Sequence, residues 1–361
     1  MRAILALEDG FVLEGESFTG PVELTGGEVI FNTTMIGYQE LITDPANAGQ
    51  MLCITYPVIG SYGINPEDME SGKAQVAALI IKECCKEPSN WRSTESLPEF
   101  LIRNNVPGIE NVDTRALALH IRENGSMRAC ISTSLSAEEL VAKAKALPAM
   151  EGADLASGVT AAAPARWNGE AREGADLAAD GSYAWSEGKA KVAVIDLGVK
   201  NSQLKALAAK GMDLLILPAA STAEQVKATG AEAVFLSSGP GDPAALTGVI
   251  AEAAKLADTM PVAGVGLGFQ VLALAFGGSS SKMKFGHHGA NYPSKDMAAG
   301  KVIITVRNNG FAVTAPDCVE KTFEDLNDGT LEGFRHSSKP VIACQYEATP
   351  EFYEEFSKLV K

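Results

Sequence analysis

Positive charge is scarce in this sequence: 30 lysines and arginines stand against 45 aspartates and glutamates, which gives a formal net charge of -15. Nucleic acids and anionic membranes are bound by clustered lysine and arginine side chains. The charge balance therefore excludes a broad nucleic-acid or membrane-binding surface, and it favours a small molecule or a protein as the partner.

The sequence also lacks cysteines at paired spacings and an uninterrupted apolar run of membrane-spanning length. The six cysteines are scattered and no two form a CxxC motif, so we expect a reduced, cytoplasmic compartment. Glu8 and Asp9 come too early for a signal peptide. The longest apolar stretch, 261–278, contains Pro261, Gln270 and several glycines, and a strand followed by a helix explains it better than a membrane span.

The composition that is present predicts a globular protein of two domains. The chain has 361 residues, of which 46% are hydrophobic and 21% charged, and two domains of this size can each bury a core. Residues 1–150 carry short alternating segments broken by glycines, which predict strands and hairpins, with helices later. Ser136 and Glu139 form a capping box that predicts the start of one helix.

Residues 151–190 are rich in Ala, Gly, Ser and Glu, and we interpret them as a connecting segment packed through Trp167 and Trp185. From 191 to 361 the pattern changes to continuous apolar strands alternating with helices, as in the strand 192–196 and the helix 201–210. This alternation predicts an α/β domain with a doubly wound, mostly parallel sheet, whose ligands bind beyond the carboxyl ends of the strands.

Two glycine-containing turns are expected at that end of the sheet. Residues 264–270 (GVGLGFQ) predict a strand, 261–266, a sharp turn and a helix, 269–276. Such an elbow usually presents Ser or Cys, whereas Gly266 presents no side chain. The second turn is 237–243 (SSGPGDP). The two turns either aim backbone N–H groups at one oxyanion or are ordinary strand–helix turns, and the local pattern leaves both open.

Longer motifs give the sequence a family resemblance. It resembles the small-subunit family of glutamine-dependent carbamoyl-phosphate synthase, in which a mixed α/β N-terminal domain precedes a class I glutamine amidotransferase domain. The resemblance covers nearly the whole chain. It is carried by residues 27–33 (GEVIFNT), 37–40 (GYQE), 43–45 (TDP), 55–57 (TYP), 113–115 (DTR), 238–243 (SGPGDP), 282–289 (KMKFGHHG) and 309–313 (NGFAV).

The resemblance implies a subunit that hydrolyses glutamine and passes ammonia to a large subunit, for arginine and pyrimidine biosynthesis. It also implies that ATP and magnesium bind only to the large subunit, so we expect no cofactor and no metal site in this chain. In the family, a Cys attacks the glutamine amide, a His moves the proton and a Glu orients the His, while backbone N–H groups hold the oxyanion.

This chain departs from the family at the reacting groups. The family elbow is Gly-Ile-Cys-Leu-Gly-His-Gln, and here Gly266 replaces the Cys and Phe269 the following His. The family sequence Gln-x-His-Pro-Glu-Ala is shortened to residues 345–348 (QYEA), which removes the His. Glu347 remains as the family's triad Glu, and with no His to orient we expect it to be solvated or locally hydrogen-bonded.

Neighbouring residues offer no obvious replacement for the lost groups. Cys344 ends an apolar run and is expected in the core. Tyr346 is a poor base, because an ordinary tyrosine has a pKa of about 10. We expect a structural role for His336.

The glutamine pocket is better preserved than the reacting groups. The resemblance implies that glutamine would contact residues of both turns and of a later loop: Gly239, Gly241, Leu267, Gln270, Asn308, Gly310 and Phe311. Without the resemblance, capping, turn formation and core packing would explain the polar and aromatic members of this set. The family has a Ser where this chain has Ala46, so one hydroxyl contact to glutamine is lost.

Three hypotheses follow. The first is a carbamoyl-phosphate synthase small subunit that still docks on its large subunit but has lost glutaminase activity. The second is a non-catalytic regulatory or scaffold protein that binds glutamine or a related amide. The third retains an enzyme, either because Ser237 or Ser238 replaces the thiol or because the sequence carries engineered changes to a normal enzyme.

Overall fold

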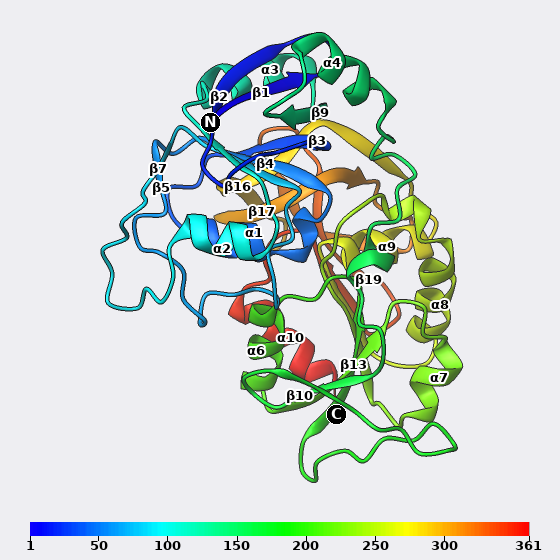
Figure 1. Ribbon diagram of the computed structural model, residues 1–361. Helices are drawn as coiled ribbons and strands as arrows, with labels where there is room; N and C mark the ends of the chain where they lie inside the picture. Colours follow the sequence, from blue (N-terminus) through cyan, green and yellow to red (C-terminus); the bar gives the residue numbers. More distant parts are fainter. Residues whose placement is uncertain (361) are drawn as a thin grey trace. The chain divides into compact units, whose positions relative to one another are not determined.

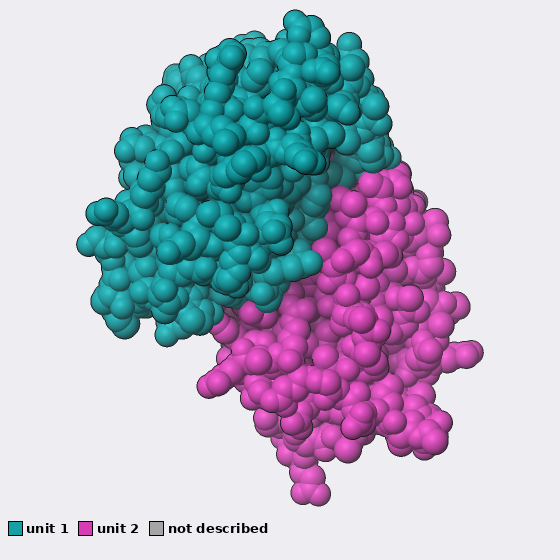
Figure 2. All heavy atoms as spheres, viewed as in Figure 1, with its two compact units in different colours: residues 1–151, 283–290 teal, residues 152–282, 291–361 magenta. Residues whose placement is uncertain are grey.

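The computed structural model describes residues 1–360, which form two compact units (Figures 1 and 2). Unit 1 comprises Met1–Glu151 and Met283–Ala290, and unit 2 comprises Gly152–Lys282 and Asn291–Lys361. No helix among the described residues has the length and apolarity that a membrane span requires.

Unit 1 is built around a closed barrel with the strand order β1-β2-β8-β6-β4-β3-β9. The barrel strands are β1 (Arg2–Leu7), β2 (Val12–Ser17), β3 (Thr25–Asn32), β4 (Gln50–Ile54), β6 (Ala78–Ile80), β8 (Gly108–Glu110) and β9 (Met127–Ser132). Alternate residues of β1 enter two cores: Leu5 and Leu7 join one cluster, while Ala6 packs with the helix α4 (Ala137–Ala146) in another. The strands predicted for this half therefore exist, and both faces of β1 are buried.

The remaining elements of unit 1 are short. They are α1 (Tyr38–Thr43), the 3-10 helix η1 (Pro45–Asn47), β5 (Val58–Ile59), β7 (Glu83–Cys84), α2 (Leu97–Arg103) and α3 (Thr114–Asn124). The predicted capping box is confirmed at α4, where the Ser136 side chain accepts from the Glu139 amide and the Glu139 side chain accepts from the Ser136 amide.

Unit 2 contains one sheet of 11 strands in the order β11-β10-β13-β12-β14-β15-β20-β19-β18-β16-β17. Its central strands are parallel, and they are β12 (Ala190–Asp196), β13 (Met212–Pro218), β14 (Ala233–Leu236), β15 (Val262–Val265) and β20 (Val341–Cys344). The flanking strands are β10 (Ala165–Trp167), β11 (Arg172–Gly174), β16 (Ser280–Asp296), β17 (Val302–Val313), β18 (Val319–Asp325) and β19 (Leu331–His336). The middle of β16, Met283–Ala290, belongs to unit 1.

Helices cover both faces of the parallel strands. One apolar cluster contains residues of α7 (Ala223–Ala228), α8 (Thr247–Ala257) and α9 (Leu267–Ala275). The other contains residues of α6 (Asn201–Ala209) and α10 (Pro350–Leu359). Two short helices, α5 (Ala156–Val159) and η2 (Pro243–Ala245), complete the unit. The predicted doubly wound α/β domain is confirmed.

The segment 151–190, which we interpret from the sequence as a connection, contributes strands to the sheet of unit 2. Almost all of it belongs to unit 2, because β10 pairs antiparallel with β13 and thereby extends the central sheet. Trp167 is buried, and the indole N–H of Trp185 donates to the Thr229 carbonyl at 2.7 Å. Both tryptophans thus anchor the segment as part of the unit.

Candidate functional site

The elbow is formed where β15 ends and α9 begins. Gly266 caps the helix with φ 58° and ψ -114°, a conformation that costs a residue with a side chain about 1–3 kcal/mol. Its neighbours in the motif are required for packing, since a Cβ on Gly268 would lie 2.2 Å from the Leu236 carbonyl oxygen. The predicted strand–turn–helix is confirmed, with the helix starting at Leu267 rather than at Phe269.

The second turn, which follows β14, packs directly against the elbow. A Cβ on Gly239 would lie 1.9 Å from the Leu197 carbonyl oxygen and 3.0 Å from a methyl carbon of Leu267. Within residues 1–360, the backbone N–H groups of Gly239 and Leu267 donate to no acceptor. Two unpaired donors, one of them at a helix N-terminus, are suited to stabilise a developing negative charge.

Two serines lie beside these donors, and both are hydrogen-bonded to neutral groups. The Ser237 hydroxyl donates to the Ser238 carbonyl at 2.8 Å and accepts from the Leu197 amide at 3.0 Å. The Ser238 hydroxyl donates to Gln203 Oε1 at 3.2 Å. No basic side chain in the described chain is hydrogen-bonded to either hydroxyl, so neither serine has the partner that an activated nucleophile requires.

Glu347 forms an ion pair with Lys200, a residue that our sequence analysis missed. The Lys200 side chain is 5% exposed and that of Glu347 is 35% exposed. Asp196 ends β12 and accepts the amides of Gly198 and Val199, which folds the chain so that Lys200 caps α6. The signal available in the sequence was the position of Lys200, just beyond the carboxyl end of a parallel strand.

The residues considered as replacements are structural. Cys344 is 1% exposed, and burial raises the pKa of its thiol well above the ordinary value, which confirms the predicted core position. Burial also raises the pKa of Tyr346, so this phenol is no base at neutral pH. His336 Nδ1 accepts the amides of Ser338 and Lys339 at 3.1 and 3.2 Å, and burial lowers the His336 pKa.

Several residues of the expected glutamine pocket come together. Gln270, which is 3% exposed, donates through Nε2 to the Phe311 carbonyl and to Gln345 Oε1, both at 2.8 Å. Asn308, Gly310 and Phe311 all lie on β17. Gln270 therefore ties α9 to β17 and to the segment after β20, which is a structural role whether or not a ligand binds.

The other two expected contacts lie apart from this group in the chain. Gly241 has φ 96° and follows Gly239 in the second turn. Ala46 lies in η1 of unit 1, where the Asp44 carboxylate accepts its amide at 2.8 Å.

A buried charged cluster behind β20 was also missed. Arg307 on β17 is 1% exposed and contacts Asp325 at 2.7 Å and Glu332 at 2.9 Å. Burial raises the pKa of Glu332 to about 8, so Glu332 holds a proton at neutral pH while Asp325 balances the guanidinium. The Glu332 carbonyl accepts the Gln345 amide at 2.9 Å, which links the cluster to the site. Its members are remote in sequence, and no local pattern joins them.

Comparisons with known proteins give a family match in each half of the chain. The model "Carbamoyl-phosphate synthase small chain, CPSase domain" matches residues 5–131, and "Glutamine amidotransferase class-I" matches residues 193–354. Carbamoyl phosphate synthase small chains from two Nitratidesulfovibrio vulgaris strains are 55% and 54% identical, covering 97% and 100% of this chain and 94% and 99% of theirs. The Akkermansia muciniphila small chain is 46% identical, over 97% of this chain and 93% of its own.

Proposed function

The chain belongs to the carbamoyl-phosphate synthase small-chain family, and from this premise we propose that it serves as a small subunit that does not hydrolyse glutamine. In this proposal the chain docks on a large subunit, and the assembly uses free ammonia. The large subunit binds ATP and magnesium, and this chain contributes no cofactor.

The observation that carries the proposal is Gly266. In the family reaction a thiolate at this position forms the bond to the glutamine carbonyl carbon, and glycine has no atom that can do so. The surroundings supply no substitute, because the nearby serine hydroxyls lack a base.

Glu347 supports the same conclusion. With no histidine between Gln345 and Glu347, the carboxylate has no imidazole before it to orient, and it neutralises Lys200 instead. An ammonium has no lone pair to accept a proton, so a lysine held in this ion pair does not serve as a general base.

The test is a reconstituted synthase. The chain is combined with a carbamoyl-phosphate synthase large subunit from a relative such as Nitratidesulfovibrio vulgaris, and carbamoyl phosphate formation is measured with MgATP, bicarbonate and a nitrogen source. We expect product with ammonium and none above background with glutamine.

The control is the same large subunit combined with its own small chain, which should use glutamine. Equal rates with ammonium and glutamine in the complex of this chain would contradict the proposal. The proposed docking would be contradicted if this chain neither co-purifies with the large subunit nor changes the rate of its ammonium reaction.

Glutamine binding without hydrolysis is a second candidate function. The unpaired amides of Gly239 and Leu267 favour it, because they remain available to a ligand carbonyl. Isothermal titration of the isolated chain with glutamine separates this candidate from the first, since a sensor needs affinity without a partner. Absence of heat at millimolar glutamine would contradict it.

A further inference from the structure

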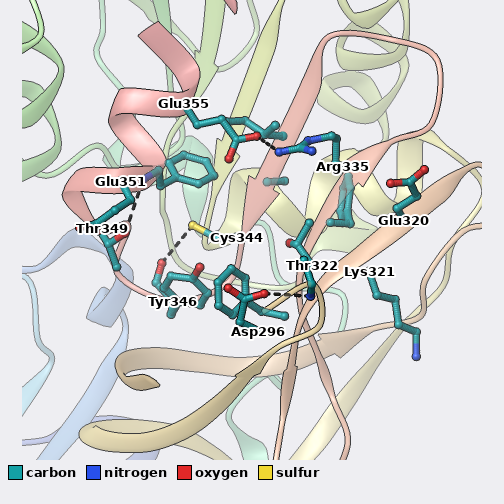
Figure 3. Close-up of a pocket in the computed structure, with 16 residues that line it drawn as sticks. Asp296, Glu320, Lys321, Thr322, Arg335, Cys344, Tyr346, Thr349, Glu351 and Glu355 are labelled. Atoms are coloured by element: carbon teal, nitrogen blue, oxygen red, sulfur yellow. Dashed lines mark hydrogen bonds and ion pairs between the residues drawn. The ribbon is translucent and has the colours of Figure 1, made fainter. Parts of the chain in front are cut away.

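A second pocket lies in unit 2 between α10 and the strands β18, β19 and β20 (Figure 3). Its volume is about 350 Å³, at the lower end of the roughly 300–1,000 Å³ of small-molecule sites. β20 forms part of its floor, and the same strand supports the elbow, because the Cys344 carbonyl accepts the Gly266 amide at 2.9 Å. The pocket has its own lining and shares none of the glutamine-site residues.

The floor of the pocket is apolar and aromatic. The rings of Phe323 and Tyr346 meet edge to face at a centroid distance of 5.3 Å, and Phe352 contributes a third ring from α10. Figure 3 shows Tyr346 beside Cys344, whose thiol donates to the Tyr346 carbonyl at 3.5 Å. A flat apolar body is the kind of group that such a floor accommodates.

The Tyr346 hydroxyl is a polar group of this floor that has no partner within the protein. Tyr346 is 3% exposed and lines the pocket, and its hydroxyl makes no hydrogen bond with any residue from 1 to 360. The hydroxyl oxygen is nevertheless not among the buried atoms without a partner, so solvent reaches it. A ligand in the pocket that brings a hydrogen-bonding group can therefore pair with this hydroxyl in place of solvent.

The rim of the pocket carries an excess of negative charge. Its charged side chains are Asp296, Glu320, Lys321, Arg335, Glu351 and Glu355, four acids and two bases. Both bases are paired, Arg335 with Glu355 across the pocket and Lys321 with Glu324 at 3.1 Å. Glu320 has no ion pair with any described residue, so an incoming cation has a carboxylate to meet.

The shortened segment borders this space. Relative to the family sequence Gln-x-His-Pro-Glu-Ala, the chain lacks two residues after Tyr346, and Thr349 already caps α10. Thr349 and Phe352 line the pocket together with residues of β18 and β19. Figure 3 shows Glu320 near Arg335 and Lys321, away from Tyr346, so a ligand that reaches both residues must span the pocket.

We propose that this pocket binds a small primary amine with an aromatic ring, that is, an arylalkylamine. The ring packs against Phe323 and Phe352, a ring N–H or hydroxyl pairs with the Tyr346 hydroxyl, and the ammonium lies against Glu320. The inference concerns a site apart from the elbow, and it holds whether or not glutamine is hydrolysed.

The test uses tryptamine as the probe, titrated into the full chain in a calorimeter. Indole-3-propionate is the matched probe, because it has the same ring with a carboxylate in place of the ammonium. We expect tryptamine to bind in the micromolar to millimolar range, and indole-3-propionate to bind about tenfold more weakly or not at all.

Two variants assign the site. Tyr346→Phe removes only the hydroxyl and should weaken tryptamine binding about 3- to 10-fold, and Glu320→Gln should weaken it about 3-fold. Glu187→Gln, an exposed acid of unit 2 outside the pocket, should leave binding unchanged. No tryptamine binding, equal binding of both probes, or equal binding by the chain and both pocket variants would overturn the proposal. Because Glu320 is exposed, its variant keeps the test valid if Tyr346→Phe misfolds.

Discussion

Two features of the backbone geometry at Gly266 favour glycine over a residue with a side chain. Its φ of 58° lies in the region that side chains rarely adopt, and a Cβ built on it would lie 3.2 Å from Ser238 Cβ. A Cys at this position would bear both the backbone strain and the close contact. Glycine avoids both, so the backbone of this elbow is relaxed.

The change Gly266→Cys should therefore lower stability. We expect the free energy of unfolding to fall by about 1–3 kcal/mol, because the side chain is forced into a strained conformation beside Ser238. Urea denaturation followed by circular dichroism measures the effect. The thiol alone should give no glutamine hydrolysis, because no histidine lies between Gln345 and Glu347.

Gly248→Ala is the control for this substitution. Gly248 lies within α8 and nothing lies within 4 Å of its Cβ position, so alanine should raise stability by about 0.5–1 kcal/mol. A Gly266→Cys protein as stable as the parent, or more stable, would show that the elbow carries no strain.

At the scale of the elements, the buried cluster joins β17, β18 and β19 behind the site. The Arg307 guanidinium also donates to Ser294 Oγ at 2.6 Å and to Thr305 Oγ1 at 3.1 Å. Its Nε, Nη1 and Nη2 atoms therefore all have acceptors. A guanidinium buried beside two carboxyl groups is tolerated when one of them keeps its proton. The raised pKa of Glu332 identifies that carboxyl.

This cluster makes stability depend on pH. The pKa of Glu332 is about 8 in the folded chain, against about 4.3 for an ordinary glutamate, so the folded state binds the proton more tightly. The contribution of this group is complete below the unfolded pKa and is lost as the pH rises through about 8. We expect a loss of roughly 1–3 kcal/mol between about pH 5 and pH 9, measured by urea unfolding at each pH.

The Glu332→Gln variant isolates this effect, because glutamine resembles the protonated acid and does not titrate. The parent should approach or exceed the variant in stability at low pH and fall below it at high pH. Parallel pH profiles for the two proteins would show that Glu332 is ionised in the folded state.

The sequence patterns correctly predicted the elements that depend on interactions between residues close in sequence. The alternating strand and helix segments from Lys191 onward, the elbow and the capping box of Ser136 depend on residues close in sequence, and all three are present. Closure of the barrel, the pairing of β10 with β13 and the Lys200–Glu347 pair depend on residues far apart in the chain. Hydrophobic periodicity carries no information on such pairings, which explains why they were missed.

At the scale of the whole molecule, the chain has the fold of a small-chain family member, and our proposal is that its reacting side chains are lost. Matches to the small-chain family cover nearly the entire chain, and the sheet, the elbow and the paired turns are intact. We therefore expect its function to lie in the assembly with a large subunit.

One measurement tests this account most directly. The reconstituted complex is given unlabelled ammonium together with glutamine that carries heavy nitrogen in its side-chain amide, and the isotope content of the carbamoyl phosphate is determined by mass spectrometry. The ammonium reaction proves that the complex is active in the same sample. The account predicts unlabelled carbamoyl phosphate with the glutamine left intact, and heavy nitrogen in the product would contradict it.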